Sequence, residues 1–258
     1  MSSRLLSIAR NTFREAVRDR VLYNLVAFAV LMSGAAVLVG QISFGIERLV
    51  VINLGLTAIS LFGVVISILI GIGLVSKEMD KRTIYTMLSR PVRRWEFILG
   101  KYLGLSGTLL VNTTLMALGV FAALLYVSHH FHATDAWILV ALYFIVLEFL
   151  IVTSISLLFS SFSTPLMSAV FASCFFVVGT FAEDLRELAK MTQGLAHWMA
   201  TGVAYLVPNF SALNVISSVA HEQPVALQLI LYNTGYALLY SIAVLCGTIL
   251  IFERRNLK

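Results

Sequence analysis

Long uncharged runs separated by short charged segments dominate the pattern of hydrophobic and polar positions along the chain. Residues 21–46, 49–76, 102–134 and 227–252 contain no Asp, Glu, Lys or Arg. A helix needs about 20 apolar residues to cross the roughly 30 Å of hydrocarbon in a bilayer. Each run therefore predicts a membrane-spanning helix, and the first span is expected over residues 21–40.

Residues 136–182 form one longer apolar stretch, in which Glu148 is the only charged side chain. The stretch is long enough for two spans if the chain turns. A cluster of Ser and Thr immediately before Pro165 predicts that turn, because such residues favour loops and Pro suits the first position of a helix. We therefore expect spans over residues 137–159 and 166–182.

Residues 191–221 are also uncharged and offer a seventh span. With six spans and a cytoplasmic amino terminus, 15 of the 18 Lys and Arg residues lie on the cytoplasmic side. This satisfies the positive-inside rule, whereas a seventh span would move the basic carboxyl-terminal tail outside. Pro208 and Asn209 also interrupt the segment. We therefore interpret residues 183–226 as two short external helices that enter the outer leaflet and return.

Residues 4–20 combine apolar side chains at helical spacing, such as Leu6, Ala9 and Phe13, with arginines largely on the opposite side. This pattern indicates an amphipathic helix at the membrane surface. The alternative is the charged start of a cleaved signal peptide, but the apolar run that follows exceeds the roughly 7 to 15 residues of such peptides. We interpret residues 21–40 as an uncleaved span.

Composition supports the same fold class. The chain of 258 residues is 59% hydrophobic and 12% charged, whereas soluble proteins carry about 25% charged residues. These values predict an all-α integral membrane protein with six transmembrane helices, and they give no reason to expect a nucleic-acid partner for a net charge of +5. We expect a single membrane domain, residues 1–258, divided into a surface helix (1–20), spans one and two (21–75), a cytoplasmic loop (76–101), spans three to five (102–182), external helices (183–226), and span six with its tail (227–258).

The cytoplasmic loop is the most distinctive part of the sequence. It contains 10 of the 31 charged residues, of both signs, together with a Thr, an apolar face and a Pro. Anionic lipid headgroups in the bilayer would explain Lys and Arg alone. The mixed pattern favours docking into a groove on another protein.

This loop resembles the cytoplasmic loop of ABC-2 type permeases, the membrane subunits of a class of ATP-binding-cassette transporters. The matching residues are Glu78, Thr83, Leu88, Ser89, Pro91, Val92, Arg94, Gly100 and Lys101, while Arg82 stands where many members have Gly. The predicted topology is similar too. The amphipathic amino-terminal helix resembles that family's elbow helix, and the broken segment before the last span resembles its paired external helices.

The resemblance implies that the loop couples the chain to a separate ABC ATPase subunit by sitting in a cleft of that subunit. The coupling residues would then be Glu78, Arg82, Thr83, Met87, Leu88, Ser89, Pro91 and Arg94. It also implies a second permease copy, as a homodimer or with a sister permease, and export rather than uptake. We expect the inner membrane of a bacterium, with both termini cytoplasmic.

No cofactor is expected on this chain, and ATP and magnesium are expected on the partner ATPase. The sequence has no G-x-x-x-x-G-K-[ST] motif, and its Gly100-Lys101 pair is followed by Tyr102. Two alternatives stay open. A standalone channel or secondary transporter leaves the patterned loop unexplained, and an intramembrane enzyme lacks a recognisable catalytic motif.

Glu148 lies near the middle of the predicted fourth span, where an ionised carboxylate costs at least ~2.5 kcal/mol. It must therefore face the interior of the bundle. One hypothesis makes Glu148 and Asn112 polar points on the translocation path, or makes Glu148 a site of proton coupling. The other makes them a structural polar site, in which Asn112, Thr113 and Thr114 of span three hydrogen-bond to the carboxylate.

Two further clusters have simpler interpretations. His129, His130 and His132 lie in one short loop without Cys, so we expect a solvated loop and no metal site. Gly100, Gly104 and neighbouring small residues give span three a small-residue face, which is typical of ordinary helix packing in membranes.

Overall fold

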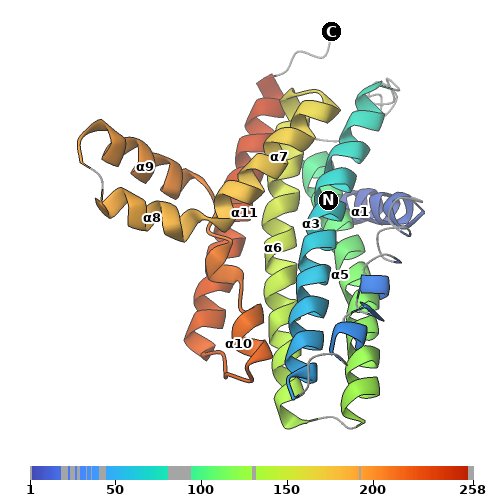
Figure 1. Ribbon diagram of the computed structural model, residues 1–258. Helices are drawn as coiled ribbons and strands as arrows, with labels where there is room; N and C mark the ends of the chain where they lie inside the picture. Colours follow the sequence, from blue (N-terminus) through green and yellow to red (C-terminus); the bar gives the residue numbers. More distant parts are fainter. Residues whose placement is uncertain are drawn as a thin grey trace.

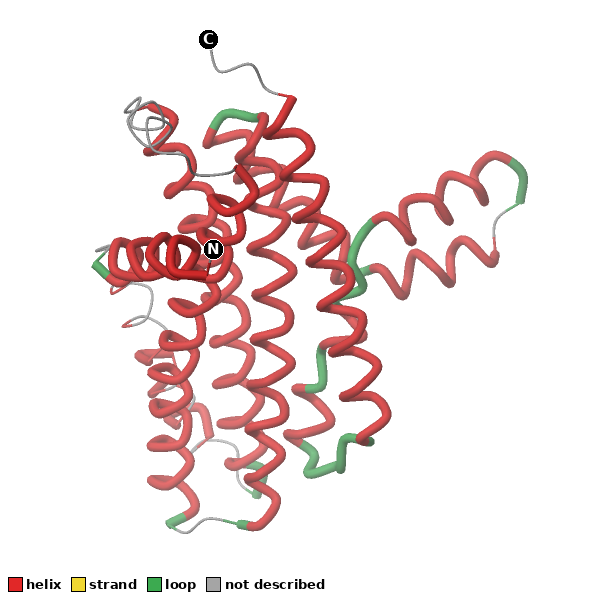
Figure 2. Tube along the Cα trace, turned by 180° about the vertical axis from the view of Figure 1, so that it is seen from behind, coloured by secondary structure: helices red, strands yellow, loops and turns green. Residues whose placement is uncertain are grey.

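The computed structural model describes residues 2–18, 23, 27, 30–32, 34–35, 37–40, 45–80, 94–129, 132–191 and 193–254. Within these residues the structure is helical and contains no strand (Figures 1 and 2), which confirms the all-α fold class. The elements are α1 (Ser2–Val17), α3 (Glu47–Asp80), α5 (Arg94–Ser128), η1 (Ala133–Asp135), α6 (Ala136–Phe162), α7 (Pro165–Thr180), α8 (Ala182–Met191), α9 (Leu195–Leu206), η2 (Ser211–Leu213), α10 (Ile216–Ala220) and α11 (Leu227–Arg254).

Four of the described helices are long and apolar enough to cross a membrane, and they confirm predicted spans two, three, four and six. They are Glu47–Gly73, Trp95–Ser128, Ala136–Phe162 and Leu227–Phe252. Two bent helix pairs raise the total to as many as six if each pair is one broken span. The predicted six instead included residues 21–40, only parts of which lie within the described residues.

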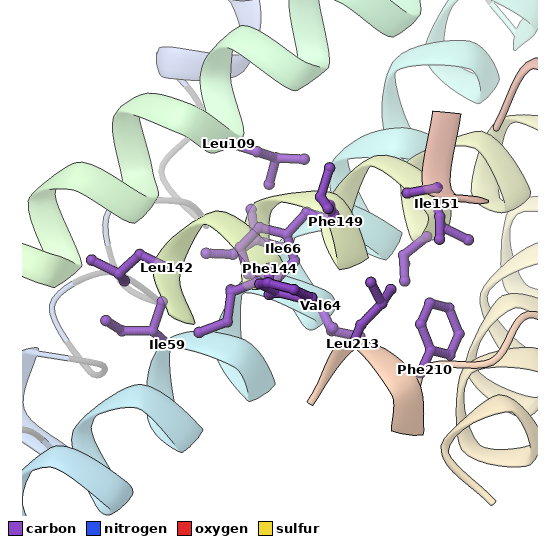
Figure 3. Close-up of a cluster of buried hydrophobic side chains, with 14 of the residues drawn as sticks. Ile59, Val64, Ile66, Leu109, Leu142, Phe144, Phe149, Ile151, Phe210 and Leu213 are labelled. Atoms are coloured by element: carbon purple, nitrogen blue, oxygen red, sulfur yellow. The ribbon is translucent and has the colours of Figure 1, made fainter. Parts of the chain in front are cut away.

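Helix α6 is the centre of the bundle, because it packs against α3, α5, α7 and α11. Phe144 and Phe149 of α6 are buried within a cluster that also draws on α3 and α5 (Figure 3). A Cβ atom on Gly63 would lie only 1.9 Å from the ring of Phe149. Glycine at this position of α3 therefore allows the aromatic ring to pack directly on the backbone.

The bundle has two distinct ends. At one end, α3 finishes at Asp80, α5 begins at Arg94 and α11 finishes at Arg254 (Figure 1). We call this the loop end, because α3 ends and α5 begins there. At the other end, called the clamp end, lie the start of α3, the connection from α5 to α6 and the start of α11.

Helix α7 covers nearly all of the predicted fifth span, residues 166–182. Pro165 begins it, as expected for the turn after α6. Its 16 residues rise only about 24 Å, which is less than the hydrocarbon thickness. The chain then bends by 62° into α8, so residues 166–182 do not form one straight span.

Helices α8 and α9 pack together as a hairpin that projects from the side of the bundle (Figures 1 and 2). We call residues 182–206 the lateral arm. A non-helical break at residues 207–210 follows α9, as Pro208 predicts, and leads into η2 and α10. The predicted pair of short external helices is thus one hairpin followed by two shorter helical pieces.

The amphipathic helix predicted over residues 4–20 is α1, which lies across α5 (Figure 1). Its contact with α5 is a feature that the prediction did not include. Thr12 and Ala16 are 2% and 1% exposed there, whereas Leu6 is 68% exposed. The helix therefore presents a face of small and β-branched residues to α5.

Candidate coupling and translocation sites

The coupling loop begins and ends on long helices. Helix α3 continues beyond its membrane span to Asp80, with Glu78 in its last turn, and Arg94 is the first residue of α5. The other coupling residues lie outside the described residues: Arg82, Thr83, Met87, Leu88, Ser89 and Pro91. Their role therefore stays a prediction.

Buried charges mark the start of α5. Glu96 is 2% exposed and Lys101 is 1% exposed. Lys101 Nζ lies 5.5 Å from the ring centroid of Phe97, and that ring stacks on Phe252 of α11 with centroids 6.1 Å apart. Long charged side chains are rarely buried without compensating interactions, so this cluster joins the first turns of α5 to the last turns of α11. The Gly100-Lys101 pair marked the resemblance, but hydrophobicity alone gave no sign that Lys101 is buried.

Helix α1 rests on glycines of α5. A Cβ atom on Gly100 would lie 2.7 Å from Ile8 Cγ2, and one on Gly104 would lie 2.5 Å from the carbonyl oxygen of Ala9. Such distances leave no room for a side chain, so the two backbones touch. We call Gly100 and Gly104 the glycine seat. These residues are more than a generic packing face, because they hold the surface helix beside the first turns after the coupling loop.

Glu148 has a hydrogen-bond partner on α3. Ser60 Oγ donates to Glu148 Oε2 at 3.0 Å, and both residues lie near the middle of their spans. The predicted partners on span three were wrong, because Thr113 and Thr114 donate to backbone carbonyls one turn earlier in α5. The carboxylate therefore bridges α3 and α6.

Asn112 is buried in α5 at 3% exposure. Its Nδ2 atom has no hydrogen-bond partner within the described residues, and no hydrogen bond joins it to Glu148 there. The two polar residues predicted as one site are therefore not joined directly. Whether either lines a translocation path stays a prediction.

The clamp end contains an ion-pair network that sequence reasoning missed. The guanidinium of Arg48 pairs with Asp135, donates from Nε to Glu222 Oε1 at 3.1 Å, and lies 2.6 Å from His132 Nδ1. We call these four residues the guanidinium clamp. The side chains of Arg48 and Asp135 are 20% and 7% exposed, whereas that of Glu222 is 46% exposed. The clamp thus joins the start of α3, the α5–α6 connection and the residues before α11.

A sequence signal for the clamp existed. Arg48, which follows Glu47 directly, and the single charges Asp135 and Glu222 each flank a predicted span, on the side where basic residues are few. His132 is exposed, as predicted for a solvated loop. It also contacts Arg48, and its backbone N–H donates to Asp135 Oδ2 at 2.8 Å, which the prediction did not include. His129 is exposed, and His130 lies outside the described residues.

Comparison with known proteins gives one family. A protein-family model described as "ABC-2 family transporter protein" matches residues 6–257. The comparison with curated proteins found no match. The matched range contains most of α1 and all of the predicted coupling loop, the guanidinium clamp and the lateral arm.

Proposed function

Because the chain belongs to the ABC-2 family of transporter proteins, it is a transport component of the membrane, and we propose that it is the permease subunit of an ATP-driven exporter. In this proposal a separate ABC ATPase subunit binds the loop between α3 and α5. A second permease copy, identical or a sister chain, completes the translocation path. The setting is the inner membrane of a bacterium, with both termini in the cytoplasm.

The observation that carries the proposal is the family match together with the patterned loop. The loop mixes charges of both signs with an apolar face, which suits a groove on a protein. The chain has no phosphate-binding motif of its own. ATP and magnesium therefore belong to the partner, and this chain contributes the path and the mechanical connection.

The long helices support that mechanical role. Helix α3 has 34 residues and α5 has 35, so each extends for about 51 to 53 Å without a break. Helix α3 runs from the coupling loop to Arg48 in the guanidinium clamp. A displacement of the loop when nucleotide binds to the ATPase would therefore reach the opposite end of the bundle through a rigid rod.

The glycine seat connects the surface helix α1 to α5, one of the two long helices that would move with the loop. Backbone contact between α1 and α5 at Gly104 allows little sliding between them, because close-packed helices resist compression. Helix α1 would then move with α5 along the membrane surface. Glu148 and Ser60 join α3 to α6 at mid-span, so the same motion would reach the central helix.

Affinity purification tests the proposal. The tagged protein, purified in mild detergent from its native cells, should bring down an ABC ATPase and stimulate its ATP hydrolysis. Glu78→Arg should reduce co-purification by about tenfold or more, since a reversed charge in a docked loop costs several kcal/mol. Glu47→Arg is the matched control, because it makes the same change at the opposite end of α3 and should leave co-purification intact.

The alternatives predict different outcomes. A standalone channel or secondary transporter would transport without any ATPase and would be insensitive to Glu78→Arg. Direction is tested separately with inside-out vesicles, in which an exporter accumulates its substrate when ATP is added outside. If no ATPase co-purifies and both charge reversals behave alike, the coupling proposal is wrong.

A further inference from the structure

The base of the lateral arm lies at the middle of a membrane span. Tyr240 Oη donates to the carbonyl oxygen of Leu206, at the end of α9, at 3.0 Å. Tyr240 is close to the midpoint of the span Leu227–Phe252. On the other side of the base, the backbone N–H of Phe210 donates to Gly179 O at 3.1 Å. The arm therefore leaves the bundle between its two ends, as Figure 1 shows.

The two helices of the arm differ in what they present. Helix α9 is apolar, and its exposed side chains include Trp198 and Met199 at 75% and 64% exposure. Helix α8 carries five charged residues in ten positions: Glu183, Asp184, Arg186, Glu187 and Lys190. An ionised side chain in the middle of a bilayer costs at least ~2.5 kcal/mol. The apolar side chains of α9 can therefore contact lipid directly. The charged side chains of α8 need a polar partner to offset the cost of leaving water.

The partner is not found within the described chain. Glu183, Glu187 and Lys190 are exposed and make no ion pair among the described residues. The guanidinium carbon of Arg186 lies 5.5 Å from the ring centroid of Tyr205, and its Nε is buried there without a hydrogen-bond partner. The face of α8 that carries Glu183, Glu187 and Lys190 is thus charged and exposed, and Arg186 lies at its border with α9.

Four charged residues of α8 form two pairs, and the members of each pair lie at equal distances from the centre of the helix and carry opposite charges. Along the chain their signs run negative, positive, negative and positive, at Glu183, Arg186, Glu187 and Lys190. Reversing the helix about its centre places Glu183 opposite Lys190 and Arg186 opposite Glu187. With 3.6 residues per turn, all four side chains lie within an arc of about 100°. An identical helix lying antiparallel would therefore meet an opposite charge at each of these positions.

We propose that the lateral arm is a self-recognition surface, in which α8 lies antiparallel to α8 of a second copy of this chain. Glu183 then pairs with Lys190 of the partner subunit, and Arg186 pairs with Glu187 of the partner subunit. A two-fold axis parallel to the bundle reverses the direction of a helix that runs roughly perpendicular to it, as the arm helices do in Figure 1. The same axis makes each contact occur twice.

The inference rests on the proposed function only for the presence of two permease copies. It specifies which surface joins them and selects an identical copy over a sister chain. Anionic headgroups do not meet the same need, because the four-residue arc carries two acidic and two basic residues, and the base of the lateral arm lies at mid-span. Mutual pairing also shields these charges from hydrocarbon, which offsets their desolvation cost.

Charge reversal tests the contact in the full-length protein in native membranes. Glu183→Lys should weaken dimerisation by about tenfold or more, because each copy then places Lys against Lys. Adding Lys190→Glu to the same chain should restore dimerisation, since opposite charges again face each other. Asp184→Lys is the matched control, because it makes an equivalent charge change outside the arc and should leave dimerisation within about twofold.

Disulfide cross-linking gives a second measurement. Cys174 and Cys246 are first replaced by Ala, and Glu183→Cys with Lys190→Cys is introduced. Positions 183 and 190 of one helix are about 10.5 Å apart, beyond the roughly 7 Å limit for a disulfide, so a bond can form only between copies. The double variant should give a covalent dimer on mild oxidation, and Glu183→Cys alone should not.

The outcomes separate this inference from the proposed function. If the ATPase co-purifies but the double-cysteine variant stays monomeric, the arm contact is wrong and the permease role is untouched. Equal loss with Glu183→Lys and Asp184→Lys, or failure of the swapped pair to restore dimerisation, also overturns it. Cross-linked dimers without any ATPase would support the arm contact while contradicting the proposed coupling.

Discussion

Gly104→Ala isolates the contact between the surface helix and the span that follows the coupling loop. The new Cβ atom would lie 2.5 Å from Ala9 O and 2.7 Å from Thr12 Cβ. To reach an ordinary separation of 3.4 Å from Ala9 O, α1 must move away by about 0.9 Å. The obstacle is backbone, so no side-chain rotation relieves it.

The magnitude follows from two opposing effects. Overpacking of this kind costs about 1–3 kcal/mol, while replacing Gly with Ala inside a helix gains about 1 kcal/mol. Gly107→Ala provides the matched control three residues later on α5, because its nearest atom, on Phe13, is at an ordinary 3.5 Å. Gly107→Ala should therefore be neutral or stabilising, and Gly104→Ala should be about 1–3 kcal/mol less stable than the control.

Equilibrium unfolding in mixed detergent micelles measures this difference. ATPase stimulation, measured on the same preparations with the partner present, should fall for Gly104→Ala and stay unchanged for Gly107→Ala. Equal stability of the two variants would show that α1 does not touch α5 at Gly104. Unequal stability with equal stimulation would show that the glycine seat is structural and takes no part in coupling.

Three further substitutions test other contacts. At the guanidinium clamp, Asp135→Asn should destabilise the protein by ~2 kcal/mol, whereas Glu222→Gln, at an exposed partner, should cost less than ~1 kcal/mol; thermal melts in detergent compare them. Glu148→Gln should leave assembly and ATPase stimulation intact, because the amide oxygen still accepts the serine hydrogen bond; lost transport with normal assembly assigns the carboxylate to the path. Gly63→Ala should cost about 3 kcal/mol by collision with the Phe149 ring. Phe149→Leu in the same chain should recover part of that loss, and an equally unstable double variant would refute the collision.

Hydrophobic runs and turn residues were sufficient to predict most of the helices. The turn at Pro165, the break at Pro208 and the surface helix before residue 18 all follow from local preferences of the chain. The bend of 62° after α7 was not predicted, because the uncharged run continues through Thr180 and Phe181 without a turn signal. Where a helix bends is decided by what it packs against, and Gly179 accepts a hydrogen bond from the distant Phe210.

The partners of polar side chains could not be predicted in the same way. Three polar residues on span three seemed suitable for Glu148, yet Ser60 of α3 holds it, because α6 packs on α3 at that depth. Hydrogen-bonding capacity is a property of a residue, while proximity is a property of the bundle. The clamp illustrates the same limit, since Arg48 and Glu222 are far apart in sequence and meet only in the fold.

A single guanidinium that joins three segments has a kinetic consequence. Asp135, Glu222 and His132 all contact Arg48. The α5–α6 connection and the residues before α11 therefore cannot move far from the start of α3 unless their contacts with Arg48 break. If the clamp end of the bundle opens during a transport cycle, it opens cooperatively, as one switching event with one barrier. The passage would then be shut or open, with few intermediate widths through which ions could leak.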